Sequence, residues 1–271
     1  METQTLRDFR IPAWVTAGLH DPVEVDGRIA AGMTIGAHLR SSDGTLNPAV
    51  LAAVADGCLG LAVMAGAGFD TGVVTSHLHV EFPKRVPGDL ATAHCSAVAR
   101  SVDEGFGLSE ATITDATGAT LAYATLGGVL IPRPTTTEAP QDPGTAVPAV
   151  AAHLDELLGT HIGSRTPEGV TATFRADAAL ANLYKNLHGG LGALIAIRTL
   201  DAALDTGDGS YRLADLRAVF TRSIPADGNE LRCTATVAHR GRRMAAGRAE
   251  LFASDGRVAL GVDATYVADN S

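Results

Sequence analysis

The chain has 271 residues, with 21 Lys or Arg against 30 Asp or Glu, which gives a formal net charge of -9 and a pI near 5.4. This acidic balance argues against nucleic acid as the main partner, although it leaves room for a local basic pocket that binds a phosphorylated ligand. The length fits one large domain or two ordinary ones, and either would bury a sizeable core.

The amino-terminal segment and the apolar stretches bear on the cellular location. Residues 1–10 contain acids and arginines with no apolar run after them, so we expect no secretory signal. The most apolar stretch, residues 51–63, is interrupted by Asp56 and falls short of the ~18 apolar residues of a membrane span. The three cysteines are widely spaced and form no Cys-x-x-Cys pattern, which favours reduced thiols. We therefore expect a soluble, cytoplasmic protein.

The first half of the chain predicts a long buried helix followed by strands. Asn47 is a good N-cap, Pro48 suits the first helical position, and residues 50–62 supply a wide apolar face. Across residues 73–82 apolar and polar side chains alternate, which is typical of a strand. Further strands are expected at residues 90–99, 107–114 and 121–131, the last two joined by a hairpin turn at residues 115–118.

A proline-rich segment separates this half from a second one that repeats its order. Residues 132–148 contain five prolines, a composition that supports neither a sheet ladder nor a helix. We assign them as a linker between an amino-terminal domain, residues 1–131, and a carboxy-terminal domain, residues 149–271. In the second domain we expect helices at residues 150–158 and 189–204, and strands at residues 169–176, 213–220, 231–239, 243–253 and 258–267.

Three landmarks of different residue types place the two halves in register. Each of three landmarks recurs 138 residues later: Phe82 as Phe220, Pro87 as Pro225, and Gly118 as Gly256. The start of the helix uses an offset of 141 instead, so three residues differ in length between the helix and the strands after it. Both offsets exceed the roughly 50 residues of solenoid repeats, which indicates a duplicated domain. Each copy is expected to be one helix followed by an antiparallel meander.

The two copies differ in the residues that could perform chemistry. The second copy contains Asn182 and, six residues later, His188-Gly189-Gly190, where the first copy has Ser41 and Asn47-Pro48-Ala49. Nine residues after Asn47 the first copy carries Asp56 within an apolar run, whereas the corresponding residue of the second copy is Ile197. A buried carboxylate without a partner is costly, so a functional role explains Asp56 better than a turn does.

A long helix that starts with Asn-x5-His-Gly-Gly and is wrapped by an antiparallel sheet resembles the hotdog-fold acyl-CoA thioesterases of the phenylacetate-pathway type. The resemblance covers nearly the whole chain and implies an α+β fold, a tandem double hotdog, in which each unit has a long central helix wrapped by an antiparallel β-sheet. In that family an Asp follows the His by nine residues, and two subunits pair so that the glycine turn of one faces the acid of the other. Here the first part of the motif lies in the second copy and the acid, Asp56, in the first.

The resemblance implies a role for each of these residues in thioester hydrolysis. Gly189 and Gly190 would present backbone N–H groups at the positive end of a helix to the carbonyl oxygen. Asp56 would act as a general base on water or attack the carbonyl directly, and both routes stay open. Asn182 would help to polarise the carbonyl, and His188 would hold the turn or contact the thiolate side.

Further residues complete the predicted site and its counterpart. Thr75 falls where the family has a Ser or Thr that orients water, and the equivalent residue of the second copy is Leu213. Pro48 has no N–H to offer to an oxyanion and Ile197 cannot activate water, so we expect one active centre per chain, between the two helices. Candidate ligands of the CoA phosphates are Lys84, Arg85 and Arg222, which could equally be gatekeepers of edge strands.

The sequence also bears on functions other than hydrolysis of an acyl-CoA. Residues 43–48 are faintly similar to the hydratase branch of hotdog proteins, but the catalytic His that follows Asn-Pro in that branch is replaced by Ala49 and Val50. A non-catalytic protein that binds acyl-CoA or an acyl carrier stays open, because one half-site has already lost its groups. His77, His79 and Glu81 share a strand face without a fourth ligand, so we expect neither a metal nor a cofactor. The acyl group stays open, and a homodimer of chains is a further expectation.

Overall fold

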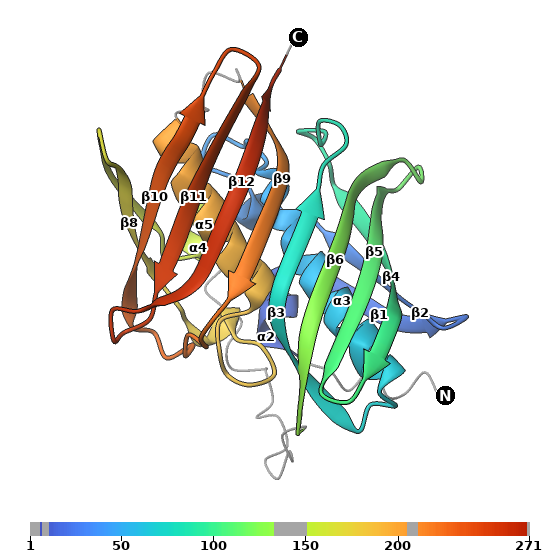
Figure 1. Cartoon of the computed structure of the whole chain (residues 1–271). Helices are drawn as coiled ribbons and strands as arrows, with labels where there is room; N and C mark the ends of the chain where they lie inside the picture. The colour runs from blue at the N-terminus through green and yellow to red at the C-terminus, as the bar shows by residue number, and fades with distance from the viewer. Residues whose placement is uncertain (1–5, 7–10, 133–150, 205–210, 270–271) are drawn as a thin grey trace.

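The structure is a computed structural model, which describes Leu6 and residues 11–132, 151–204 and 211–269. Figure 1 shows two similar halves side by side, each with one long helix behind a curved sheet. The assignment of residues 132–148 as a linker falls outside the described residues, except that Pro132 is the last residue of a strand.

The first half consists of a short helix, a hairpin, the long helix and four further strands. Its elements are α2 (Pro12–Thr16), β1 (Leu19–Val25), β2 (Arg28–Thr34), α3 (Leu51–Gly66), β3 (Thr71–Glu81), β4 (Thr92–Asp103), β5 (Phe106–Asp115) and β6 (Thr120–Pro132). Asn47 caps the 3-10 turn Pro48–Val50 that leads directly into α3, where its side-chain oxygen accepts the N–H of Ala49 at 2.9 Å. The predicted N-cap therefore starts a 3-10 turn, and the α-helix follows it.

The second half repeats this order. Its elements are α4 (Leu154–Leu157), β7 (His161–Thr166), β8 (Gly169–Arg175), α5 (Gly189–Leu204), β9 (Tyr211–Phe220), β10 (Glu230–Arg240), β11 (Met244–Phe252) and β12 (Val258–Ala268). The helix predicted at residues 150–158 is shorter in the structure, a single turn at Leu154–Leu157.

All strands belong to one twelve-stranded antiparallel sheet with the order β1-β2-β4-β5-β6-β3-β9-β12-β11-β10-β8-β7. The halves meet where β3 pairs with β9, and these strands lie at the centre of Figure 1. This pairing is symmetric about His79 and Arg217, whose positions differ by the same 138 residues as the sequence landmarks. A large antiparallel sheet with few helices is therefore confirmed.

The expectation that each half is a helix followed by a meander was wrong for the first strand after each helix. β3 pairs with β6 and β9 pairs with β12, so only the last three strands of each half form a meander. A hairpin precedes each helix, β1–β2 in the first half and β7–β8 in the second, and its inner strand pairs with the meander through β4 or β10. The outer strands β1 and β7 contain no buried residue. Strands at the edge of a sheet that bury no face lack the alternation by which a strand is recognised in a sequence.

Paired backbone contacts confirm the approximate two-fold relation between the halves. The N–H of Ala13 donates to the carbonyl of Ala181, and the N–H of Leu154 donates to the carbonyl of Arg40, so each residue of one bond lies 141 positions from its counterpart in the other. In the strands the offset is 138. The bulges at Ser76 in β3 and Ala214 in β9 show this, since they interrupt the strand pairing at equivalent positions. The three-residue difference lies between the helices and these strands, as predicted.

The two long helices cross where their backbones nearly touch. A side-chain carbon added to Gly190 would lie 2.2 Å from the carbonyl oxygen of Ala52 and 2.7 Å from the Cα of Ala53. Only a glycine fits such an approach. The crossing places the amino terminus of α5 against the first turn of α3.

Helix α3 is apolar enough to be mistaken for a membrane segment. The segment Pro48–Gly66 could cross a membrane by length and composition alone, but 83% of it is buried inside the protein. Asp56 lies in its middle and is itself buried. The helix is thus the core helix of the first half.

Replacing Gly190 with Ala should separate the helices, since the added carbon meets backbone atoms that cannot rotate away. We expect a loss of about 1–3 kcal/mol in the free energy of unfolding, measured by urea denaturation. Gly192→Ala is the matched control on the same helix, because its added carbon meets only the side chains of Leu260 and Leu187. Equal stability of the two variants would contradict the packing described here.

Candidate active site

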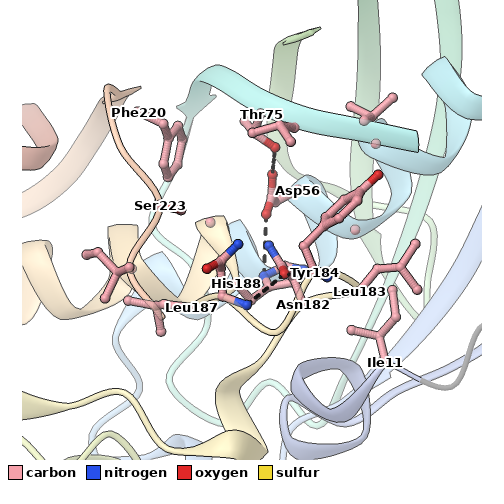
Figure 2. A pocket seen from close by; sticks show the side chains of 18 of the residues that line it. Ile11, Asp56, Thr75, Asn182, Leu183, Tyr184, Leu187, His188, Phe220 and Ser223 are labelled. Atoms are coloured by element: carbon pink, nitrogen blue, oxygen red, sulfur yellow. Dashed lines mark hydrogen bonds and ion pairs between the residues drawn. The ribbon is translucent and has the colours of Figure 1, made fainter. Parts of the chain in front are cut away.

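Asp56 is held from both halves of the chain. It lies on α3 with 7% of its surface exposed. The hydroxyl of Thr75, on β3, donates to its Oδ1 at 2.8 Å, and the backbone N–H of Gly190, in the first turn of α5, donates to its Oδ2 at 3.0 Å. Figure 2 shows these contacts converging on the carboxylate. A carboxyl group with one oxygen bound by each half cannot swing out of this position without losing two hydrogen bonds.

The start of α5 approaches this carboxylate closely. A side-chain carbon on Gly189 would lie 2.8 Å from Oδ2 of Asp56 and 3.1 Å from the ring of Phe220. The glycine therefore keeps open the space between the acid and the helix terminus. The unpaired N–H groups and the dipole of a helix start favour negative charge there.

His188 precedes this turn and lies between two side chains, of which one forms a hydrogen bond with its ring. It is 4% exposed, and its Nδ1 lies 3.4 Å from Oδ2 of Asp56. The indole Nε1 of Trp14 donates to its Nε2 at 3.2 Å. Because an indole N–H can only donate, Nε2 must carry a lone pair, and the proton of the neutral ring is on Nδ1, toward Asp56.

The protonation of His188 follows from this environment. Burial lowers the pKa of His188, and this effect exceeds the opposing attraction of the Asp56 charge. Protonation would also add an N–H at Nε2, which would then face the N–H of the indole, so that two donors would oppose each other. The ring is therefore neutral at pH 7 and suited to donate through Nδ1.

Asn182 organises the loop that leads to His188. Its Oδ1 accepts the backbone N–H groups of Tyr184 at 2.9 Å and Asn186 at 3.1 Å, which closes a turn with Lys185 at a φ of 60°. Its side chain also lines the cavity described below, and its Nδ2 makes no hydrogen bond with the described residues. Asn182 thus holds the turn with one end of its amide and leaves a donor for a ligand at the other.

These residues surround a cavity of about 470 Å³, within the range of small-molecule sites. Its wall combines α3 and β3 of the first half with the loop before α5 and the end of β9 of the second half. Most of the lining is apolar, and Figure 2 shows Ile11, Leu183 and Tyr184 around the acid and the histidine. The polar groups of the site, Asp56, Thr75, Asn182 and His188, are therefore gathered in one mostly apolar space.

Three predicted phosphate ligands are placed differently. Arg222 lines the cavity, next to Thr221 and Ser223 at the end of β9. Lys84 and Arg85 follow the far end of β3 and do not line it, and Arg85 forms an ion pair with Asp269. The cavity thus brings Arg222 alone of the three toward a ligand.

The neighbouring histidines of β3 have structural contacts. His79 accepts a hydrogen bond from Nε of Arg217 across the seam between the halves, and His77 lies against the ring of Phe106. Within the described residues no group of three or more His, Cys, Asp or Glu is arranged to hold a metal ion.

Trp14 is a residue of the site that the sequence did not reveal. It is the only tryptophan of the chain and lies in the short helix α2, far in sequence from His188. The sequence contained one indirect signal, the glycine at position 57. In the structure, a side-chain carbon added to Gly57 would lie 3.0 Å from the indole nitrogen. A glycine directly after the acid therefore marks the place where another side chain packs against the helix.

Comparisons with known proteins agree with this architecture. Residues 43–102 match the model of the thioesterase superfamily, a segment that includes Asp56 and Thr75. A search of curated proteins finds no match. Among solved structures, the TesB protein of Mycobacterium avium subspecies paratuberculosis has a TM-score of 0.61 at 14% identity, with 95% of this chain and 98% of that one covered.

Two further structures share the fold at similar distance. The acyl-CoA thioesterase II of Mycobacterium marinum has a TM-score of 0.59 at 11% identity, covering 95% of this chain and 98% of that one. The 12:0-ACP thioesterase of Umbellularia californica has a TM-score of 0.57 at 14% identity, covering 90% and 95%. The chain therefore has the fold of hotdog thioesterases along nearly its whole length.

Proposed function

We propose that this protein is an acyl-CoA thioesterase, built as a tandem double hotdog, with one composite active site between its halves. The observation that carries the proposal is the contact between the carboxylate of Asp56, from the first half, and the N–H of Gly190, from the second. It joins an acid and a helix start inside a mostly apolar cavity, which are the groups that thioester hydrolysis requires. The match of residues 43–102 to the thioesterase superfamily supports the same reaction.

The chemistry follows from the positions of these groups. Water adds to the thioester carbonyl while Asp56 takes its proton, and Thr75 orients the carboxylate through Oδ1. Negative charge develops on the carbonyl oxygen, for which the start of α5 and Nδ2 of Asn182 are the available donors. When the carbon–sulfur bond breaks, the proton passes from Asp56 to the thiolate, which gives the free acid and CoA.

One detail differs from the roles implied by family resemblance. The N–H of Gly190 already donates to Asp56, so in this arrangement it positions the acid, and the N–H of Gly189 is the donor closer to the expected substrate. Direct attack by Asp56 on the carbonyl is the alternative to base catalysis. A single turnover in heavy-oxygen water tests the direct route. Attack by Asp56 expels the CoA thiolate and forms an anhydride, and water that opens the anhydride at the Asp56 carbon leaves the label in its carboxylate.

The equivalent space in the other half is filled with side chains, which supports a single site. Where the first half has Gly57, Gly60 and Gly128, the two-fold relation places Arg198, Asp201 and Tyr266. Arg198 makes a bidentate ion pair with Asp155, the residue equivalent to Trp14.

The remaining filling groups bond to one another. The hydroxyl of Tyr266 donates to Oδ1 of Asp201 at 2.7 Å, and Nδ2 of Asn47 donates to Oδ2 at 2.7 Å. Asn47 occupies the position of His188, and Ile197 and Leu213 replace the acid and the threonine. The counterpart has therefore become a structural cluster without the groups that hydrolysis needs.

Asp56→Asn tests the proposed reaction. The amide keeps the size of the side chain but cannot accept a proton from water, so we expect kcat on a panel of acyl-CoA thioesters to fall by about 10²–10⁴-fold. Binding of a non-hydrolysable acyl-CoA, measured by calorimetry, should be retained. Unchanged turnover would remove Asp56 from the mechanism, and ligand binding without turnover in the wild type would identify a binding protein.

The number of sites is a separate prediction. Calorimetric titration with a non-hydrolysable acyl-CoA should saturate at one ligand per chain, because the counterpart space is occupied by Arg198, Asp201 and Tyr266. Two equivalent ligands per chain would contradict the composite single site.

Asp201 should make stability depend on pH. Burial raises the pKa of Asp201 to about 6, against 3.8 for the free group, although hydrogen bonds and Arg198 oppose the rise. The stability gained by protonation is complete below pH 3.8 and is lost as the pH rises through about 6. In Asp201→Asn this loss is absent, so the variant should gain stability relative to the wild type across that window. A difference in unfolding free energy that stays constant with pH would contradict the raised pKa.

A further inference from the structure

Gly60 is the exception in a buried helix. Every other residue of α3 from Leu51 to Met64 is buried, whereas Gly60 is partly exposed and lines the cavity. A side-chain carbon added there would have no atom within 4 Å. A helix wrapped by a sheet gains such exposure only where a cavity lies against it. Gly60 is therefore the position at which the backbone of α3 faces the cavity.

Gly60 lies one turn beyond the acid, and the cavity continues past it. Gly60 and Met64 follow Asp56 by four and eight residues, and all three line the cavity. At 1.5 Å per residue, the positions lie roughly 6 and 12 Å from Asp56 along the helix axis. A ligand held at the acid therefore has room to extend along this face of α3.

The walls around this stretch are aliphatic. Apart from Asp56, Thr75 and Trp14, the first-half residues that line the cavity carry neither a charge nor an aromatic ring. They are Ile11, Gly57, Gly60, Leu61, Met64, Val73, Val74 and Ile131. Methionine adapts its shape to flexible apolar ligands. An aromatic acyl group would find ring partners only near the reactive end, at Trp14, Tyr184 and Phe220.

We propose that this face of α3 binds a linear aliphatic acyl chain, and that Gly60 determines the length that the site accepts. This inference rests on the proposed thioesterase function. A carbon chain advances by less than one bond length of about 1.5 Å per carbon, so reaching Met64 takes at least about eight carbons. The substrates are then thioesters of medium-length fatty acids, and a side chain at position 60 would exclude the distal part of the chain.

The counterpart half gives an internal precedent for this blocking effect. There the position equivalent to Gly60 carries Asp201, whose side chain reaches both Tyr266 and Asn47. The same backbone position on α5 thus projects a side chain across the equivalent space. Gly60 leaves that space empty for a ligand.

The test compares kcat/KM of the wild type and Gly60→Leu across acyl-chain lengths, on butanoyl-, octanoyl-, dodecanoyl- and hexadecanoyl-CoA. Phenylacetyl-CoA is included as an aromatic substrate. The wild type should prefer octanoyl- or dodecanoyl-CoA. Gly60→Leu should lose about 10- to 200-fold in kcat/KM on these substrates while keeping butanoyl-CoA. Met64→Ala should shift the preference the other way, toward hexadecanoyl-CoA, which a general loss of stability cannot do.

Gly88→Leu is the matched control, because an added carbon there also meets nothing within 4 Å and Gly88 does not line the cavity. Its profile should equal that of the wild type. Turnover in all variants with an unchanged length profile, or a wild-type preference for phenylacetyl-CoA, would overturn the inference while leaving the thioesterase function intact. Absence of wild-type hydrolysis on every thioester would instead overturn the proposed function.

Discussion

The close crossing of the two long helices is the constraint on which the rest of the structure depends. Because Gly190 has no side chain, the first turn of α5 can lie directly against the backbone of Ala52 and Ala53. This contact brings the N–H of Gly190 within 3.0 Å of the carboxylate of Asp56. Neither half contains both partners, so the site forms only when the halves dock. The pairing of β3 with β9 fixes that docking on the opposite side of the helices.

Duplication allowed the two equivalent spaces to diverge. In one, Gly60 faces a cavity beside the acid; in the other, side chains joined by an ion pair and two hydrogen bonds occupy the interior. A buried polar cluster needs nearly complete pairing, and the raised pKa of Asp201 indicates that its charge is still costly at neutral pH. The two spaces therefore differ physically: one is a cavity with Asp56 in its wall, and the other is occupied by the side chains of Arg198, Asp201 and Tyr266.

His188 illustrates how a remote side chain decides the state of a functional group. Its sequence context identifies it as the residue before a helix start, which says nothing about its tautomer. The indole of Trp14 fixes the lone pair on Nε2, and burial keeps the ring neutral. A donor is thereby directed at Asp56 instead of at solvent.

The sequence by itself determined the elements with strong periodicity and the relation between the two halves. The helix at Gly189–Leu204, the alternating strands of both halves and the offsets of 138 and 141 are local or repetitive signals, which hydrophobic spacing and cap residues encode directly. The edge strands β1 and β7 escaped detection because they bury no face. Only the tertiary structure decided that Gly190 donates to Asp56, that Trp14 reaches His188 and that Gly60 faces a cavity. Each of these depends on segments far apart in the chain, whose distances are set by packing and not by spacing along the sequence.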